Sequence, residues 1–199
     1  MNNEIREPKQ KRSIEKKDKI IDAGWELISK NGYYKTNTVE IAKYANVSTG
    51  IVYQYFKDKH DILISGINKY GDDMFFPVLK LDLDNFNIKN FDNVANQIIQ
   101  EYIKDHKISQ SAHEEIMSMV HTDKDIAKYY YDREMNLTNS IYSMLINNNV
   151  HTECLKEKVH IIINMIDNLC HEVVYHKHNE LNYNSMIKIV INNIKDLIK

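Results

Sequence analysis

The chain has 199 residues, of which 43% are hydrophobic and 27% charged, with a mean hydropathy of -0.52. This composition is typical of a folded soluble protein and argues against a membrane-embedded or an intrinsically disordered chain. Only 5 glycines and 2 prolines are present, too few for the many tight turns of an all-β fold. The first twenty residues are highly charged, which predicts a cytoplasmic protein without a secretory signal. We expect no cofactor and no metal.

Charge is distributed unevenly along the chain. Residues 1–59 hold 12 Lys and Arg against 8 Asp and Glu, whereas residues 60–199 hold 14 against 20. A basic N-terminal part followed by an acidic remainder suggests that the N-terminal part binds a polyanion. The surplus is modest, and many basic surfaces bind nothing.

Apolar residues recur at spacings of three and four along almost the whole chain, which predicts an all-α fold. The first helix is expected over about residues 14–30, with Gly32 as its stop signal. Asn37 followed by Glu40 fits a capping box at the start of a short second helix, because each side chain can bond the other residue's backbone amide.

A tight turn and two further helices are expected next. Asn46 tolerates a positive φ and makes the turn, and Ser48 is placed to cap the third helix. Asp58 caps a fourth helix, which ends before Pro77 because proline removes a backbone donor. Residues 78–90 are expected to form a loop, and the later helices are expected at about 91–107, 110–121, 124–148, 152–178 and 183–198.

The two short helices within residues 37–56 fit a helix-turn-helix motif. A DNA major groove about 12 Å wide admits one α-helix, whose N-terminal end offers backbone donors to the DNA. Ser48, Thr49 and Gly50 are small and leave that end slim. One turn further, Tyr53 can place a hydroxyl on a phosphate.

Spacing alone leaves a second interpretation of the same residues open. Tyr53 and Tyr55 would then be half-buried packing residues, and Lys57 and Lys59 would only be solvated charges at the start of the fourth helix.

The run from Thr38 to Lys59, TVEIAKYANVSTGIVYQYFKDK, resembles the signature of the TetR family of bacterial transcriptional regulators. The matching positions are Gly32, Tyr33, Ile41, Ala42, Val47, Ser48, Gly50, Tyr53, Tyr55, Phe56, Lys59 and Leu63. The resemblance covers about residues 14–74. It implies a DNA-binding domain there and a larger helical domain for effector binding and dimerisation over residues 75–199.

Three positions depart from the family pattern. Asn46 stands where the family usually has glycine, Thr38 where it usually has an apolar residue, and Tyr55 where it often has histidine. We expect Thr38 to loosen the packing of the second helix slightly. A phenol also donates a hydrogen bond, so Tyr55 is expected to retain a phosphate contact.

The resemblance implies a ligand-responsive repressor, not an enzyme, that binds a pseudo-palindromic operator in double-stranded DNA as a homodimer and leaves it when a small-molecule effector binds. Phosphate contacts are expected from Asn37, Thr38, Ser48, Tyr53, Tyr55 and Lys59, base contacts from Val39, Thr49 and Gly50, and a further charge from Lys57. Two alternatives remain: an architectural or cell-division DNA-binding protein that recruits a protein partner, and a metal- or thiol-responsive sensor that uses Cys154 and Cys170.

Aromatic, methionine and histidine side chains are frequent in the middle of the chain. They suit an adaptable pocket for a lipophilic or cationic molecule, although they could simply fill the core. The candidate effector residues are Tyr102, His106, Met117, His121, Tyr131, Met135, Tyr142, His171 and Tyr175.

The last two expected helices carry apolar stripes broader than one buried contact requires. They fit either a buried helix pair within one chain or a pair that doubles across a twofold axis into a four-helix bundle. The residues expected at such a dimer interface are Ile163, Ile166, Cys170, Val174, Ile187, Ile191 and Ile194.

One apparent catalytic motif fails on its spacing. His171 and His176 are five residues apart, whereas the zinc-protease helix requires two histidines four apart on one face. No catalytic residue is therefore expected.

Overall fold

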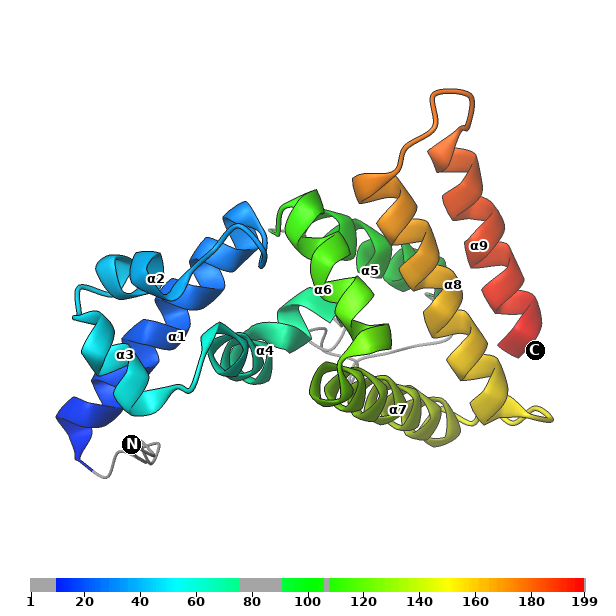
Figure 1. The fold of residues 1–199 in the computed structure, drawn as a ribbon. Coiled ribbons are helices and arrows are strands. Elements are labelled where there is room, and N and C mark those ends of the chain that lie inside the picture. Colours follow the sequence, from blue (N-terminus) through cyan, green and yellow to red (C-terminus); the bar gives the residue numbers. More distant parts are fainter. Residues whose placement is uncertain (1–9, 76–90, 106–107, 199) are drawn as a thin grey trace. The chain divides into compact units, whose positions relative to one another are not determined.

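The computed structural model describes residues 10–75, 91–105 and 108–198. These residues form nine α-helices and contain no strand (Figure 1). The all-helical prediction is therefore confirmed. The loop predicted at 78–90 lies outside the described residues.

The helices lie close to their predicted positions. Their bounds are α1 Lys11–Asn31, α2 Thr38–Tyr44, α3 Thr49–Tyr55, α4 Lys59–Phe75, α5 Phe91–Asp105, α6 Gln110–Thr122, α7 Lys124–Asn147, α8 Leu155–Tyr175 and α9 Tyr183–Ile198. The largest difference is at α8, predicted over 152–178. It is shorter because Cys154 adopts a left-handed conformation with φ 53° before it and His176 leaves helical geometry after it.

The described residues fall into two compact units. The first unit takes the described residues of 1–74 and 107–130, and the second takes those of 75–106 and 131–199. Helix α6 and the start of α7 therefore pack with the N-terminal helices. The two-domain division at residue 74 stays a prediction.

The first unit has a core to which α1, α2, α3 and α4 all contribute. Ile20, Ile41, Val52 and Ile62 are fully or almost fully buried in it. A Cβ atom built on Gly24 of α1 would lie 2.4 Å from Cγ2 of Ile62, so glycine allows α1 and α4 to approach closely. The helix-turn-helix is thus fixed to two longer helices.

Helix α6 packs against α1 within the same unit. The Ser109 amide donates to the Ser29 carbonyl at 2.9 Å, and the Ser109 hydroxyl caps α6 by accepting from Ala112 N. Ala112 and Ile116 are fully buried. Side chains of α6 are thereby brought to the end of α1.

The second unit has its own apolar core between α5, α8 and α9. Ala95 and Ile99 of α5 pack with Leu169 and Cys170 of α8 and with Ile191 of α9. None of the helices in the described ranges combines the length and apolar composition that a membrane span requires.

Candidate nucleic-acid interface

The turn between α2 and α3 has the geometry expected of a helix-turn-helix. Asn46 has φ 54°, and the Val47 amide donates to the Ala42 carbonyl at 3.0 Å. The start of α2 carries the predicted capping box: Asn37 Oδ1 accepts from Glu40 N at 3.0 Å, and Glu40 Oε2 accepts from Asn37 N at 3.3 Å. Both features follow from local sequence: the capping box fixes the start of α2, and the turn at Asn46 fixes the direction of α3 relative to α2.

The N-terminal end of α3 is open to solvent. Ser48 and Gly50 are exposed, and Thr49 is partly exposed. A Cβ atom on Gly50 would have only the Ser48 hydroxyl within 4 Å, at 3.9 Å. Ser48 occupies the cap position, but its side chain makes no capping hydrogen bond, contrary to the prediction.

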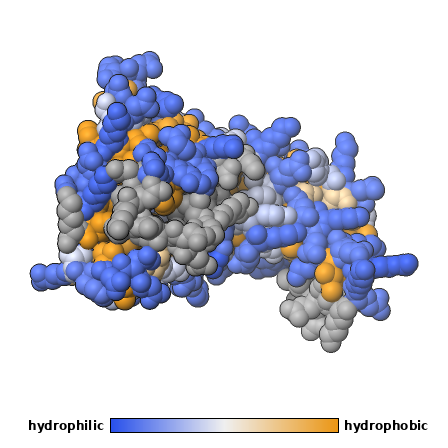
Figure 2. Space-filling view, turned by 180° about the vertical axis from the view of Figure 1, so that it is seen from behind, coloured by the Kyte–Doolittle hydropathy of each residue, from blue (hydrophilic) through white to orange (hydrophobic). Residues whose placement is uncertain are grey.

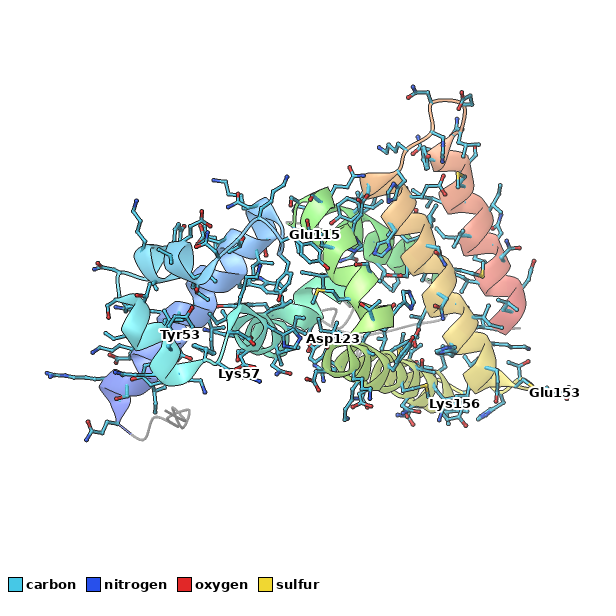
Figure 3. The ribbon with its side chains drawn as sticks, in the orientation of Figure 1. Tyr53, Lys57, Glu115, Asp123, Glu153 and Lys156 are labelled. Carbon is cyan, nitrogen blue, oxygen red and sulfur yellow. The ribbon has the colours of Figure 1, made fainter. Side chains whose placement is uncertain are left out.

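A pair of hydroxyl groups joins α2 to α3 beside this exposed end. Thr38 Oγ1 and Tyr53 Oη lie 3.0 Å apart, and Tyr53 is 45% exposed (Figure 3). The next residue of α2, Val39, is 63% exposed. A polar pair and an apolar side chain are therefore presented to solvent from the first turn of α2 and from α3.

Two residues predicted to contact phosphates are engaged elsewhere. Tyr55 is 5% exposed and packs in the core of the first unit. The Lys59 ammonium donates to the backbone carbonyls of Tyr33 at 2.5 Å and Thr36 at 2.8 Å. We correct Tyr55 to a core residue. Lys59 binds the loop between α1 and α2, and its phosphate contact stays a prediction.

Lys57 lies between α3 and α4 with an exposed side chain (Figure 3). Its backbone amide donates to Asp61 Oδ2 at 2.8 Å. The Asp61 amide in turn donates to Asp58 Oδ1 at 3.0 Å, which confirms the predicted cap of α4. The backbone at Lys57 is therefore fixed while its charge faces water.

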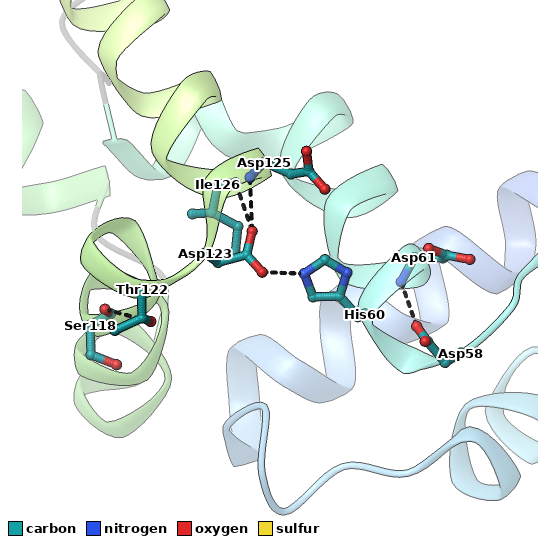
Figure 4. A network of polar contacts seen from close by, with 8 residues as sticks. All are labelled: Asp58, His60, Asp61, Ser118, Thr122, Asp123, Asp125 and Ile126. Atoms are coloured by element: carbon teal, nitrogen blue, oxygen red, sulfur yellow. Dashed lines mark hydrogen bonds and ion pairs between the residues drawn. The ribbon is translucent and has the colours of Figure 1, made fainter.

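A network of polar contacts joins the start of α4 to the junction of α6 and α7 (Figure 4). His60 Nε2 and Asp123 Oδ2 lie 2.7 Å apart, and Asp123 Oδ1 caps α7 by accepting from Asp125 N and Ile126 N. Burial raises the pKa of Asp123, but the hydrogen bonds from Ile126 and His60 outweigh it, so the pKa is lowered.

Two polar contacts of the first unit were not predicted from the sequence. They are the His60–Asp123 contact and the hydrogen bond that Glu115 accepts from Tyr34 N at 3.1 Å.

Among the described residues, Asp58, His60 and Asp61 bring possible metal-ligating atoms within 4.8 Å of one another. The two carboxylates converge because both accept backbone hydrogen bonds at the start of α4. Their arrangement is thus explained by helix capping.

The candidate effector residues are divided between the two units. His106 and the side chain of Tyr102 lie outside the described residues. Met117 and His121 belong to the first unit, while Tyr131, Met135, Tyr142, His171 and Tyr175 belong to the second. His121, Tyr131 and Met135 are exposed.

Two of these residues in the second unit are partly enclosed. An open groove of about 510 Å³ is lined by Tyr142 together with His151, Cys154 and Lys156. Burial raises the pKa of Tyr175 to about 12. The groove contains no other residue of the candidate effector set.

The apolar stripes of α8 and α9 face into the chain. Five of the seven residues assigned to a dimer interface are buried within the chain itself: Ile163, Cys170, Ile187, Ile191 and Ile194. We correct these five to core residues, because a side chain buried in its own chain leaves no area for a partner. Ile166 and Val174 are partly buried.

Other apolar side chains of the second unit reach its surface, as Figure 2 shows in orange. Ile161 of α8 is 51% exposed and Ile189 of α9 is 59% exposed. Neither was among the residues predicted for an interface.

The two cysteines differ in accessibility. Cys154 is exposed, whereas Cys170 is buried and burial raises the pKa of its thiol. A protonated buried thiol is a poor nucleophile and a poor metal ligand. Cys170 therefore does not support the thiol-sensor hypothesis.

Residues 20–65 match the sequence model of the family described as bacterial regulatory proteins, tetR family. The matched segment contains most of α1, all of α2 and α3 and the beginning of α4. Over these residues the chain is thus similar to the tetR family of regulators. A stretch of 49 residues is similar to the HTH-type transcriptional regulator HbdR of Aromatoleum sp., at 53% identity, over 25% of this chain and 21% of HbdR.

Curated relatives match over only 21% to 32% of their own length. Solved structures extend the similarity of fold to nearly the whole chain. The fatty acid degradation regulator FadR from Bacillus halodurans has a TM-score of 0.61 at 20% identity, over 94% of this chain and 96% of that one. A protein from Saccharomonospora viridis in complex with choline has a TM-score of 0.66 at 15% identity, over 90% and 95%.

Proposed function

We propose that this protein is a transcriptional repressor that binds a pseudo-palindromic operator in double-stranded DNA as a homodimer and is released by a small-molecule effector. The observation that carries the proposal is the exposed start of α3 beside the Thr38–Tyr53 hydroxyl pair, within the segment that matches the tetR family. An α-helix with a slim and polar N-terminal end fits a major groove.

The proposed DNA interface divides into phosphate and base contacts. The proposed phosphate contacts come from the hydroxyl groups of Thr38, Ser48 and Tyr53, from the exposed amide of Asn37 and from the charge of Lys57. Val39, Thr49 and Gly50 lie nearest the base edges, where a valine side chain and a threonine methyl fit a thymine methyl. No arginine stands among these residues for bidentate guanine recognition, so phosphate contacts dominate the affinity.

Dimerisation is proposed through the outer face of α8 and α9. Ile161 and Ile189 are exposed there, and pairing of these faces would remove apolar area from water at about 25 cal/mol per Å². Two copies then present two recognition helices to successive major grooves, so the spacing of the half-sites reflects the geometry of the dimer.

The effector is proposed to be lipophilic or cationic. The related folds of a fatty acid degradation regulator and of a protein in complex with choline support these two chemical classes. Aromatic and methionine side chains of the second unit, including Tyr142 and Tyr175, suit both classes. Release follows if the effector binds better to a conformation whose recognition helices no longer match the operator.

The test is selection of duplexes from a random double-stranded pool by the full-length protein, followed by mass spectrometry of any small molecule released on denaturation. We expect enrichment of two inverted half-sites. Affinity for the enriched duplex should fall with a slope of about -0.9 in log–log salt dependence for each phosphate neutralised. No enrichment, or an affinity that barely changes between about 50 and 200 mM salt, would contradict the proposal.

A further inference from the structure

We propose that Glu115 is a positioning residue for the DNA interface: from α6, its carboxylate holds the loop between α1 and α2 and so fixes the exposed start of α2. This inference rests on the proposed function, because it assigns a task to a residue that lies outside the helix-turn-helix. Glu115 belongs to the same compact unit as α1 to α4.

The Glu115 carboxylate fills the concave side of the loop. Its Oε2 accepts from the Tyr34 amide at 3.1 Å. Gly32 has φ 94°, and a Cβ atom there would lie 2.7 Å from Oε1 and 2.8 Å from Oε2. The absence of a side chain at Gly32 is therefore what allows the carboxylate to reach the backbone.

A positive charge binds other backbone groups of the same loop. The Lys59 ammonium donates to the carbonyls of Tyr33 and Thr36, and it lies 4.0 Å from the centre of the Tyr33 ring. Burial lowers the pKa of Lys59, and the charge of Glu115 acts in the opposite direction. Glu115 and Lys59 thus stabilise each other electrostatically while each binds the loop.

The loop leads directly into the DNA interface. Thr36 is buried, with its hydroxyl donating to the Gly32 carbonyl at 2.8 Å, and it is followed by the capping residue Asn37. The next residue, Thr38, forms the hydroxyl pair with Tyr53. A shift of the Tyr34 backbone would therefore also displace Asn37 and Thr38, which follow it within four residues and are proposed to contact phosphate.

The first measurement is amide hydrogen exchange of residues 33–38 in the full-length protein without DNA. The variants are Glu115→Ala, Glu115→Gln and the control Glu114→Ala. We expect exchange at Tyr34 to accelerate about tenfold in Glu115→Ala, because a hydrogen bond to a charged acceptor is lost. Glu115→Gln keeps an acceptor oxygen and should fall between Glu115→Ala and the wild type.

The second measurement is affinity for the duplex that the wild-type protein enriches from a random pool. We expect Glu115→Ala to bind about fivefold to tenfold more weakly, and Glu115→Gln to recover part of the loss. Glu114 lies on the same helix, and its carboxylate accepts from Gln110 at 2.9 Å. Its replacement removes the same negative charge, which by itself would favour binding to a polyanion.

The outcomes are distinct. Unchanged exchange at Tyr34 overturns the inference, and so does faster exchange with DNA affinity equal to that of Glu114→Ala, because Glu115 would then only support the fold. If Glu115→Ala unfolds, Glu115→Gln takes its place in both comparisons. Failure of the wild-type protein to enrich any duplex contradicts the proposed function itself and is seen before any variant is made.

Discussion

The two units of the molecule differ in what their polar contacts hold in place. In the first unit, side chains from separate helices form defined polar contacts: Thr38 with Tyr53, His60 with Asp123 and Glu115 with the Tyr34 backbone. In the second unit, an apolar cluster joins α5, α8 and α9, and polar contacts of Thr138 with His160 and of Tyr183 with Glu172 also link separate helices. Hydrogen bonds depend on direction and apolar contacts much less. The polar contacts of the first unit therefore fix the orientation of groups near the proposed DNA interface, whereas the apolar cluster of the second unit provides burial.

The largest expected effect is in the apolar cluster of the second unit. Ile191 is 4% exposed, so Ile191→Asp buries a carboxylate without a partner. We expect a loss of at least about 4 kcal/mol in the free energy of unfolding. Urea denaturation followed by circular dichroism should show early loss of part of the helical signal.

Ile189→Asp is the matched control, because Ile189 lies on the same helix and is 59% exposed. We expect the urea midpoint to stay close to that of the wild type while light scattering shows monomers. A variant that remains dimeric would remove this face of α9 from the proposed interface. Equal destabilisation by both variants would contradict the distinction between the inner and outer faces.

Which face of each helix is buried within the chain could not be predicted from the sequence. The spacing of apolar residues predicted α8 and α9 correctly, because helical periodicity is a local property. It could not decide what each stripe packs against, and Ile191 was assigned to a partner chain although α5 and α8 cover it. That choice depends on contacts between segments far apart in the sequence.

In the first unit, much more was predictable from local signals. Asn37, Asn46 and Asp58 act as the capping and turn residues that their types suggest. Tyr55 was misassigned because family resemblance gives residue types but not the direction of a side chain. Glu115 was missed, since its partner, the Tyr34 amide, lies 81 positions away and is backbone.

The second prediction concerns the loop between α1 and α2. Gly32→Ala places a Cβ atom against the Glu115 carboxylate at a φ of 94°. We expect the free energy of unfolding to fall by about 2 kcal/mol, from backbone strain and the lost hydrogen bond at Tyr34. Thermal denaturation measures the loss.

The double variant Gly32→Ala with Glu115→Ala sharpens this result. If the clash with the carboxylate is the main cause, the double variant should lose less than the sum of the two single variants. Additive losses would mean that the strain at Gly32 is independent of Glu115.

The third prediction concerns the hydroxyl pair. Tyr53→Phe removes a hydroxyl that is exposed, so stability should change by less than about 0.5 kcal/mol. Affinity for the enriched duplex should fall about threefold to tenfold, because one polar contact is lost. Fluorescence anisotropy measures the affinity. Tyr55→Phe is the control: Tyr55 is buried, and its variant should bind DNA as the wild type does.

The smallest expected effect concerns the His60–Asp123 contact and is seen as a pH dependence. The folded-state pKa of Asp123 lies below its ordinary value of 3.8, so its contribution is present above about pH 4 and is lost as the pH falls through the lowered value. Asp123→Asn retains an oxygen to cap α7 but removes the charge. We expect the variant to be less stable than the wild type at pH 6 by under about 1 kcal/mol, with the difference shrinking towards pH 3.

Urea denaturation at both pH values measures this, with Asp125→Asn as the control for loss of a carboxylate in the same turn. Asp125 is exposed and contributes its backbone amide, not its side chain, to the Asp123 cap. A pH-independent difference between Asp123→Asn and the wild type would mean that the charge of Asp123 adds nothing to its role as a cap. The contact between α4 and the start of α7 would then depend on hydrogen-bond geometry and not on charge.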